Sequence, residues 1–309
     1  MKIKLSGICD FAALLVLTAT VFGFLGGLFW AFDLFSHFRV QYMQVGLVLI
    51  GITLWRRQYK RAVALVLLAC LNYAFVLPLY FGKPAPSIEK PVRAMLMNLN
   101  AGNGNTAQVL EVIEKANPDL LLLEEVTPEW IRELAPLKKQ YKYRIAEPQE
   151  GCFGIMLLSR HPLERKKIVE IGTADVPSIV TEAHLPGGII SFIGTHPLPP
   201  MGAAYSAHRN SQLAALPAIV KDQKYPVLLV GDLNTSPWSP YFTKLIRESG
   251  LKNSMKGFGF QPTWPRNLRF LRIPLDHMLH DPEIAIHHRV VGGDVGSDHL
   301  PVIVDFSIK

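Results

Sequence analysis

The chain has little cysteine, and it lacks charge over long stretches near its start. It holds 3 cysteines in 309 residues: Cys9 and Cys70 fall in or beside apolar runs, while Cys152 stands alone. This spacing excludes a disulfide framework, and we expect Cys152 to be a small buried residue. The runs without Asp, Glu, Lys or Arg cover residues 11–32, 40–55 and 62–82.

The net positive charge is small in the longer second part of the chain. The whole chain carries a net charge of +7, but residues 1–88 hold eight Lys or Arg against two Asp, a net of +6. Only +1 (7 − 6) therefore belongs to residues 89–309. The basic character indicates membrane topology, whereas a nonspecific nucleic-acid binder would be expected to carry a basic stripe.

The three uncharged runs predict a membrane anchor. A helix needs roughly 20 apolar residues to cross the hydrocarbon core. Residues 11–32 and 62–82 meet this length, whereas residues 40–55 provide only 16. We therefore predict three membrane-spanning helices within residues 1–88, with a buried or re-entrant middle segment as the alternative.

Lys and Arg near the three runs predict their orientation. Lys2 and Lys4 precede the first run, and four Lys or Arg crowd residues 56–61, between the second and third runs. Cytoplasmic loops carry such an excess, so three crossings place everything after Lys83 outside the cytoplasm. In a bacterium this is a multi-pass inner-membrane protein with a periplasmic domain. If the middle segment does not span, the domain is cytoplasmic instead.

A Pro-rich linker, residues 83–87, precedes about 220 residues, enough for one sizeable domain. Apolar patterning predicts helices at 106–116, 203–220 and 240–249. It predicts strands at 92–98, 120–124, 154–159, 179–184, 189–195, 227–231, 276–280 and 302–306. Because residues 181–199 read as a hairpin through Pro186 to Gly188, a layered α/β sandwich fits better than a parallel doubly wound sheet.

Polar side chains lie at or close to the ends of six of these strands. They are Asn98 and Asn100, Glu124 and Glu125, His196, Asp232 and Asn234, Asp276, and Asp298 with His299. Carboxylate and amide oxygens are ligands for a hard cation such as Mg²⁺, and imidazole suits phosphate chemistry. This pattern predicts a metal-dependent phosphoesterase site at the edge of stacked sheets.

With these motifs the chain resembles the endonuclease/exonuclease/phosphatase superfamily, which has the DNase I-like fold. The resemblance covers residues 92–306 in the family's order, with bacterial, membrane-anchored members most similar in appearance. Its motifs are Met97-Asn98-Leu99-Asn100, Pro118-Asp119-Leu120 to Glu125-Val126, Ser159-Arg160-His161-Pro162, Thr195-His196, Gly231-Asp232-Leu233-Asn234, Pro262-Thr263-Trp264-Pro265, Leu275-Asp276-His277 and Ser297-Asp298-His299. It implies a four-layered α/β/β/α sandwich of two mixed, mostly antiparallel sheets, with residues 89–309 as the catalytic domain.

The resemblance also implies roles for single residues. Glu125, Asn98 and Asp298 would hold Mg²⁺ or Mn²⁺, with Glu124 supporting them from behind. Asp232 and Asn234 would orient the attacking water and hold phosphoryl oxygens. His299, paired with Asp276, would act on the phosphate, and His196 would act from the opposite side.

Three further residues are candidate substrate contacts: Asn100, Arg209 and Trp264. Arg209 would bind a substrate phosphate or pair with a carboxylate. Trp264, with Arg266, Arg269 and Arg272, would face an anionic substrate, form a packed loop, or face lipid headgroups.

Each of these assignments also has an ordinary structural alternative. Asn98 could serve a turn, Glu125 could be a surface acid, and Asp232 could cap a helix.

The sequence thus predicts a membrane-anchored, Mg²⁺- or Mn²⁺-dependent phosphoesterase that hydrolyses phosphodiester bonds and acts beside a lipid bilayer. Its substrate would be nucleic acid, or alternatively a phospholipid or sugar phosphate. A catalytically silent binding module of the same fold is the alternative from another class. Nothing in the sequence indicates an obligatory protein partner.

Overall fold

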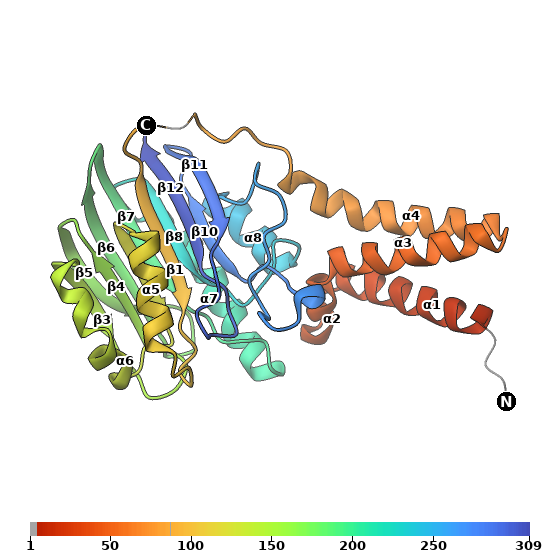
Figure 1. Ribbon diagram of the computed structural model, residues 1–309, viewed down its shortest axis with the longest axis horizontal. Coiled ribbons are helices and arrows are strands. Elements are labelled where there is room, and N and C mark those ends of the chain that lie inside the picture. Colours follow the sequence, from red (N-terminus) through yellow and green to blue (C-terminus); the bar gives the residue numbers. More distant parts are fainter. Residues whose placement is uncertain (1–4, 87) are drawn as a thin grey trace.

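A computed structural model describes residues 5–86 and 88–309. Long helices near the amino terminus project to one side of a two-sheet sandwich that is formed by the rest of the chain (Figure 1). A short helix, α2 (Trp30–Ser36), lies where the projecting helices meet the sandwich.

Each sheet of the sandwich has six strands. The first has the order β11-β12-β1-β2-β4-β3, with bounds Ile284–Val291, Val302–Ile308, Val92–Asn98, Leu120–Glu124, Ile155–Ser159 and Tyr143–Glu147. The second has the order β5-β6-β7-β8-β10-β9, with bounds Leu163–Glu170, Pro177–Leu185, Gly188–Thr195, Val227–Asp232, Asp276–His280 and Lys252–Asn253. Among the strands of the described residues, only the pairs β1–β2 and β7–β8 are parallel, which confirms the predicted mixed, mostly antiparallel sheets.

Strand alternation separates the layers, as β1 illustrates. Ala94 and Leu96 enter the core between the sheets, whereas Met95 and Met97 enter the core under the outer helices. Successive strand residues face opposite sides, and both sides of β1 are buried, so the strand reads as continuously apolar.

Helices cover both outer faces and complete the four layers. Helices α5 (Thr106–Ala116) and α6 (Pro128–Glu133) bury Val109, Ile113 and Trp130 against the first sheet. Helices α7 (Ala203–Lys221) and α8 (Pro240–Ser249) bury Leu213 and Leu245 against the second. The predicted α/β/β/α sandwich is confirmed.

The predicted helices and strands match the structure to within a few residues, and the hairpin turns at Pro186 and Gly187 as expected. The sequence reading missed β3, β5, β9, β11 and α6. Of these, β5 is an exposed edge strand rich in Lys and Glu, and β11 has a register shift between Ile286 and His288. Such strands lose the apolar alternation that identifies a strand in sequence.

The amino-terminal helices are α1 (Leu5–Phe24), α3 (Arg39–Trp55) and α4 (Tyr59–Val76), which lie side by side (Figure 1). Gly7–Phe24 and Tyr59–Leu79 are long and apolar enough to cross a membrane. A third span would require that α2 and α3, which meet at a bend of 60°, form one unit.

The first predicted span, residues 11–32, does not end where expected. Helix α1 stops at Phe24, and α2 turns back beside it and contacts α7 of the sandwich. Gly26 allows this close return, because a Cβ there would lie 3.0 Å from the Cα of Asp33. The Gly26-Gly27 pair was a local signal for this break, because Gly-Gly marks turns, but the length of the uncharged run alone does not reveal it.

Candidate active site

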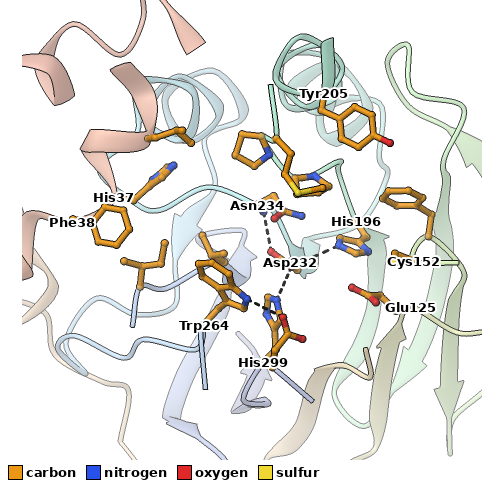
Figure 2. Close-up of a pocket in the computed structure, with 18 residues that line it drawn as sticks. His37, Phe38, Glu125, Cys152, His196, Tyr205, Asp232, Asn234, Trp264 and His299 are labelled. Atoms are coloured by element: carbon orange, nitrogen blue, oxygen red, sulfur yellow. Dashed lines mark hydrogen bonds and ion pairs between the residues drawn. The ribbon is translucent and has the colours of Figure 1, made fainter. Parts of the chain in front are cut away.

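The predicted site residues converge on a cavity of about 590 Å³ between the sandwich and α2 (Figure 2). Glu125, His196, Asp232, Asp298 and His299 line one part of it. His37 and Phe38, from the junction of α2 and α3, lie across the cavity from Glu125. The candidate site is therefore built jointly by strand ends and by the amino-terminal segment.

The centre of the polar part is formed by Asp232, Asp276 and His299. Antiparallel pairing of β8 with β10 sets Asp276 opposite Asp232. His299 Nδ1 lies 2.9 Å from Asp276 Oδ2, and its Nε2 lies 3.5 Å from Asp232 Oδ2. Because the Asp276 carboxylate accepts a hydrogen bond from the Nδ1–H of His299, the other ring nitrogen, Nε2, is directed towards Asp232 and the cavity.

A second imidazole reaches the same carboxylate from β7. His196 Nε2 lies 3.6 Å from Asp232 Oδ2, and the ring lies 5.9 Å from that of Phe153. His196 Nδ1 is buried and finds no hydrogen-bond partner among the described residues. The two predicted histidines thus flank Asp232, as expected for a pair acting on one phosphate.

Burial and charge separate the pKa values of these groups. Burial opposes protonation of His299, but the charges of Asp276 and Asp232 prevail and raise its pKa to about 10. Burial lowers the pKa of His196 to about 4, and it raises that of Asp232 to about 7. The two imidazoles therefore differ in affinity for a proton although they share a carboxylate neighbour.

The three predicted metal ligands lie together on a connected set of hydrogen bonds. Asn98 Nδ2 donates to Glu125 Oε1 at 3.0 Å, and Asn98 Oδ1 accepts the backbone N–H of Asn100. Asn100 Nδ2 in turn donates to Asp298 Oδ1 at 2.7 Å. Asn100 therefore stands behind a cavity-lining carboxylate.

Glu125 is held in place by its backbone and its neighbours. Its φ of 58° is in the left-handed region, which a glutamate rarely adopts, and its Oε2 accepts the N–H of Ala101. Such backbone geometry at a carboxylate facing a cavity is typical of functional positions. The alternative of an ordinary surface acid does not fit these contacts.

Glu124 lies behind the site, as predicted. It is fully buried and accepts the backbone N–H of Asp232 with both oxygens, at 3.2 and 3.1 Å. Burial, with the charges of Asp232 and Asp276, raises its pKa well above the ordinary value. Gly231 makes this approach possible, since a Cβ there would lie 1.9 Å from the Thr195 carbonyl oxygen and 3.0 Å from Glu124 Oε1.

Asn234 reaches the cavity through a tight turn after β8. Asp232 Oδ1 accepts the backbone N–H of Asn234 at 2.9 Å, and Asn234 has a φ of 49°. Its side-chain amide donates to the Pro197 carbonyl oxygen. Asp232 therefore shapes this turn as well as facing the two histidines.

Arg209 does not line the cavity. Its Nη2 lies 2.7 Å from Asp33 Oδ2 of α2, and both side chains are fully buried. The carboxylate-pairing alternative is thus the observed one. Its Nη1 donates to the carbonyl oxygen of Asn234 at 3.0 Å, so the ion pair also holds the turn that carries a predicted catalytic residue.

The sequence reading missed the contribution of α2 to the site. Besides Asp33, His37 Nδ1 lies 2.9 Å from Ser236 Oγ and accepts the Ser236 backbone N–H at 3.3 Å. Ser239 Oγ donates to Asp33 Oδ1 at 2.8 Å. The sequence signal for this contribution was Asp33, an acidic residue between two apolar runs. A buried charge requires a partner, so Asp33 would have to pack against a polar group elsewhere in the chain.

Trp264 contacts a predicted metal ligand directly. Its Nε1 donates to Asp298 Oδ2 at 3.0 Å, and its ring lies 6.4 Å from that of His299. Arg266 pairs with Asp294, and Arg272 donates to the backbone of Arg266, whereas Arg269 is exposed. This segment therefore packs around the site, and Trp264 faces the cavity.

The expectation of a buried Cys152 was wrong. The residue is exposed and lines the cavity. Partial burial of its thiol, together with the negative charge of Glu125, raises the pKa of the thiol. A raised pKa makes this thiol a poor nucleophile.

The fold and this arrangement agree with a known family. The profile of the Endonuclease/Exonuclease/phosphatase family matches residues 95–299, and the chain belongs to this family. The segment from Met95 to His299 includes all of the site residues described above except those from α2. The family and fold are those of hydrolases that act on phosphate esters, and divalent metal ions are generally used across the superfamily.

Solved structures show the same fold at low sequence identity. Humanized zebrafish (D. rerio) TDP2 has a TM-score of 0.60 at 14% identity, covering 70% of this chain and 98% of that one. The human Nocturnin catalytic domain has a TM-score of 0.60 at 20% identity, covering 71% and 95%. A Bacteroides thetaiotaomicron endonuclease/exonuclease/phosphatase family protein has a TM-score of 0.59 at 15% identity, covering 74% and 100%.

A curated relative gives a shorter match. A UPF0294 protein of Vibrio parahaemolyticus is 27% identical over 100 residues, which is 32% of this chain and 34% of that protein. The chain thus matches about a third of the length of this relative.

Proposed function

We propose that the protein is a membrane-anchored, divalent-metal-dependent hydrolase of phosphate esters, and of phosphodiesters in particular. One observation carries the proposal: Glu125, Asp232 and His299, from three distant parts of the sequence, face one cavity (Figure 2). Convergence of carboxylate, amide and imidazole groups is what phosphoryl transfer to water requires.

The donor set fits a hard cation such as Mg²⁺ or Mn²⁺. Glu125 and Asp298 line the cavity with carboxylate oxygens, and Asn98, which donates to Glu125 and accepts the Asn100 N–H, would add its amide oxygen by sharing that contact. Zinc would be expected to have more imidazole or thiolate ligands. When bound, the ion would neutralise phosphate charge and so favour attack by water. Asn100 and Trp264 hold the Asp298 carboxylate in position for this role.

The remaining residues have roles in handling water and phosphate. Asp232 lies within 3.6 Å of both imidazoles and is placed to orient a water molecule. His299, held by Asp276, directs Nε2 into the cavity, where it would donate to the phosphate as charge develops. His196 would contact the phosphate from the other side, and Asn234 would complete the turn beside it.

The helix arrangement supports an extracytoplasmic catalytic domain in a bacterial inner membrane. Asp10 of α1 pairs with Arg61 of α4 at 2.8 Å, at the end of the helices far from the sandwich (Figure 1). The basic residues 56–61 lie at this same end. Because basic loops face the cytoplasm, the sandwich would lie on the opposite side. Helix α3, with 17 residues, is about 25 Å long, which is at the short end of the range that crosses the hydrocarbon core, while α2 lies against α7 of the sandwich.

A water-soluble aryl phosphodiester tests the proposed activity. The full-length protein in nanodiscs is expected to hydrolyse it with Mg²⁺ or Mn²⁺ and to lose the activity in EDTA. His299→Ala is expected to reduce kcat by at least about 100-fold, because general acid-base or electrostatic contributions of one group are of this size.

His288→Ala is the matched control, since this imidazole on β11 is 57% exposed and does not line the cavity. Activity that persists in EDTA, or full activity of His299→Ala, would contradict the proposal. No hydrolysis by the wild-type protein would favour the silent binding module.

A further inference from the structure

The cavity has a second, apolar wall that the chemistry of phosphate hydrolysis does not require. Leu34 and Phe38 come from the amino-terminal segment, Met201 comes from the loop before α7, and Tyr205 comes from the start of α7. Figure 2 shows Phe38 on the opposite side of the cavity from Glu125, with Asp232 and His299 between these two residues, and Tyr205 on the side of His196. A ligand that fills the cavity therefore contacts polar groups at one end and apolar groups at the other.

Charge in the cavity argues against a polynucleotide. No Lys or Arg is among the described residues that line it. Proteins that bind nucleic acid contact several phosphates beyond the scissile one, mainly through Lys and Arg. Arg209, the arginine predicted from sequence as a substrate contact, is fully buried against Asp33. Arg266, near Trp264, is paired with Asp294 and does not line the cavity.

Apolar side chains are also exposed on the segments around the cavity. Met201, which lines it, is 73% exposed, and Phe29 and Phe35 beside α2 are 50% and 36% exposed. Phe270 is 81% exposed in a 3-10 turn (Arg269–Leu271) that is tied to α3, because Gln41 Nε2 donates to the Arg272 carbonyl oxygen. These exposed apolar side chains lie on the side of the sandwich that faces the apolar helices. Exposed apolar residues in such a position indicate a surface that contacts lipid.

Together these observations indicate which class of ligand fits the cavity. We propose, on the basis of the function proposed above, that the substrate is a phospholipid of the surrounding bilayer. Its phosphate ester lies at Glu125, Asp232 and His299, and its apolar part lies along Leu34, Phe38 and Met201 towards the membrane. The anchor thus supplies part of the substrate-binding site in addition to localising the enzyme.

The reaction is a hydrolysis and needs no further reactant. A water oxygen forms a new bond to phosphorus, one ester P–O bond breaks, and the departing oxygen takes a proton from water. A phosphodiester lipid thereby gives a phosphomonoester and an alcohol. One of these products keeps the apolar part and stays in the bilayer, while the other is free to leave through the aqueous side.

Substrate preference tests the inference. The full-length protein in nanodiscs is assayed with Mg²⁺ on bilayer phospholipids of mixed headgroups, on the soluble aryl phosphodiester and on single-stranded and duplex DNA. We expect kcat/KM for phospholipid to exceed that for the aryl ester by at least tenfold, and DNA to be the poorest substrate.

Two substitutions in the apolar wall locate the preference. Phe38→Ala and Met201→Ser are each expected to lower the ratio of lipid to aryl-ester kcat/KM by about tenfold, as loss of several buried methylene contacts predicts. Met201 is mostly exposed, so its substitution is compatible with folding even where Phe38→Ala is not. Ile168→Ala on β5, a 38% exposed apolar residue outside the cavity, is the control and leaves the ratio unchanged.

The outcomes distinguish this inference from the proposed function. Hydrolysis of the aryl ester without hydrolysis of phospholipid, a preference for DNA, or an unchanged ratio in both wall variants overturns the inference alone. Absence of hydrolysis of every substrate overturns the proposed function, and the inference with it.

Discussion

Two buried aspartates, one in the amino-terminal segment and one in the sandwich, have similar surroundings and different consequences. Asp33 of α2 pairs with Arg209 at 2.7 Å, and neither side chain is exposed. Asp276 of β10 pairs with His299 at 2.9 Å, and the imidazole lines the cavity. Both pairs are isolated from bulk water, but only one presents an atom to a ligand.

The comparison shows that burial of a charged pair does not by itself indicate catalysis. The guanidinium of Arg209 cannot lose its proton, so the pair with Asp33 must stay intact to remain neutral overall. The imidazole of His299 can release its proton, so its pair with Asp276 can take part in chemistry. Asp33 and Arg209 therefore fasten the anchor to the Asn234 turn, while Asp276 positions a group that would act on substrate.

Removal of residues 1–88 should give the largest effect. The separated residues 89–309 would keep Arg209 without Asp33, and the turn at Ser236 without His37. We expect this fragment to be inactive and to unfold at a much lower temperature than the full chain, as measured by thermal unfolding followed by circular dichroism and by aryl-ester hydrolysis. A stable, fully active fragment would show that the sandwich does not depend on α2.

Asp33→Asn should give the next largest effect. Removing one partner of a buried pair leaves an uncompensated charge and costs about 3–5 kcal/mol of unfolding free energy. Asp10→Asn is the matched control, because the Asp10–Arg61 pair is about half exposed and its loss should cost less than about 1 kcal/mol.

A second substitution identifies the cause of that loss. Arg209→Met combined with Asp33→Asn should recover part of the stability, since the unpaired charge is then absent. The measurement is denaturant unfolding of the full chain in detergent. Equal losses for Asp33→Asn and Asp10→Asn would contradict the structural role of the buried pair.

Asp276→Asn should have a smaller effect on stability than Asp33→Asn and a clear effect on turnover. The neutral amide no longer fixes the orientation of His299, and losses of about 10- to 100-fold in kcat follow when such a supporting carboxylate is removed. Single-substrate kinetics on the aryl ester measure this, with thermal unfolding in parallel. A loss of stability without a change in kcat would reverse the assignment of the two aspartates.

Much of the sandwich was predictable because its central strands carry an unambiguous apolar pattern. Strands β1, β2 and β10 begin and end at the predicted residues, since both of their faces are buried and each strand ends on a polar residue. The exposed edge strand β5 was not predicted because water tolerates the Lys and Glu side chains along it.

The polar residues at the strand ends could be selected from sequence because chemistry restricts their types. Carboxylate, amide and imidazole groups after consecutive buried strands are expected to meet at one sheet edge, and the structure brings Glu125, Asp232, Asp298 and His299 to one cavity. The role of Arg209 was left open for the opposite reason, because a guanidinium suits either a phosphate or a carboxylate equally well.

The sequence alone determined the family, the layered sandwich and the set of groups able to act on a phosphate, because apolar periodicity and residue chemistry are local properties. Only the tertiary structure decided that Asp33 folds onto Arg209 and that Leu34 and Phe38 complete the cavity. These are contacts between residues far apart in the chain. Their partners are selected by packing and by the need to neutralise buried charge, which no local pattern records.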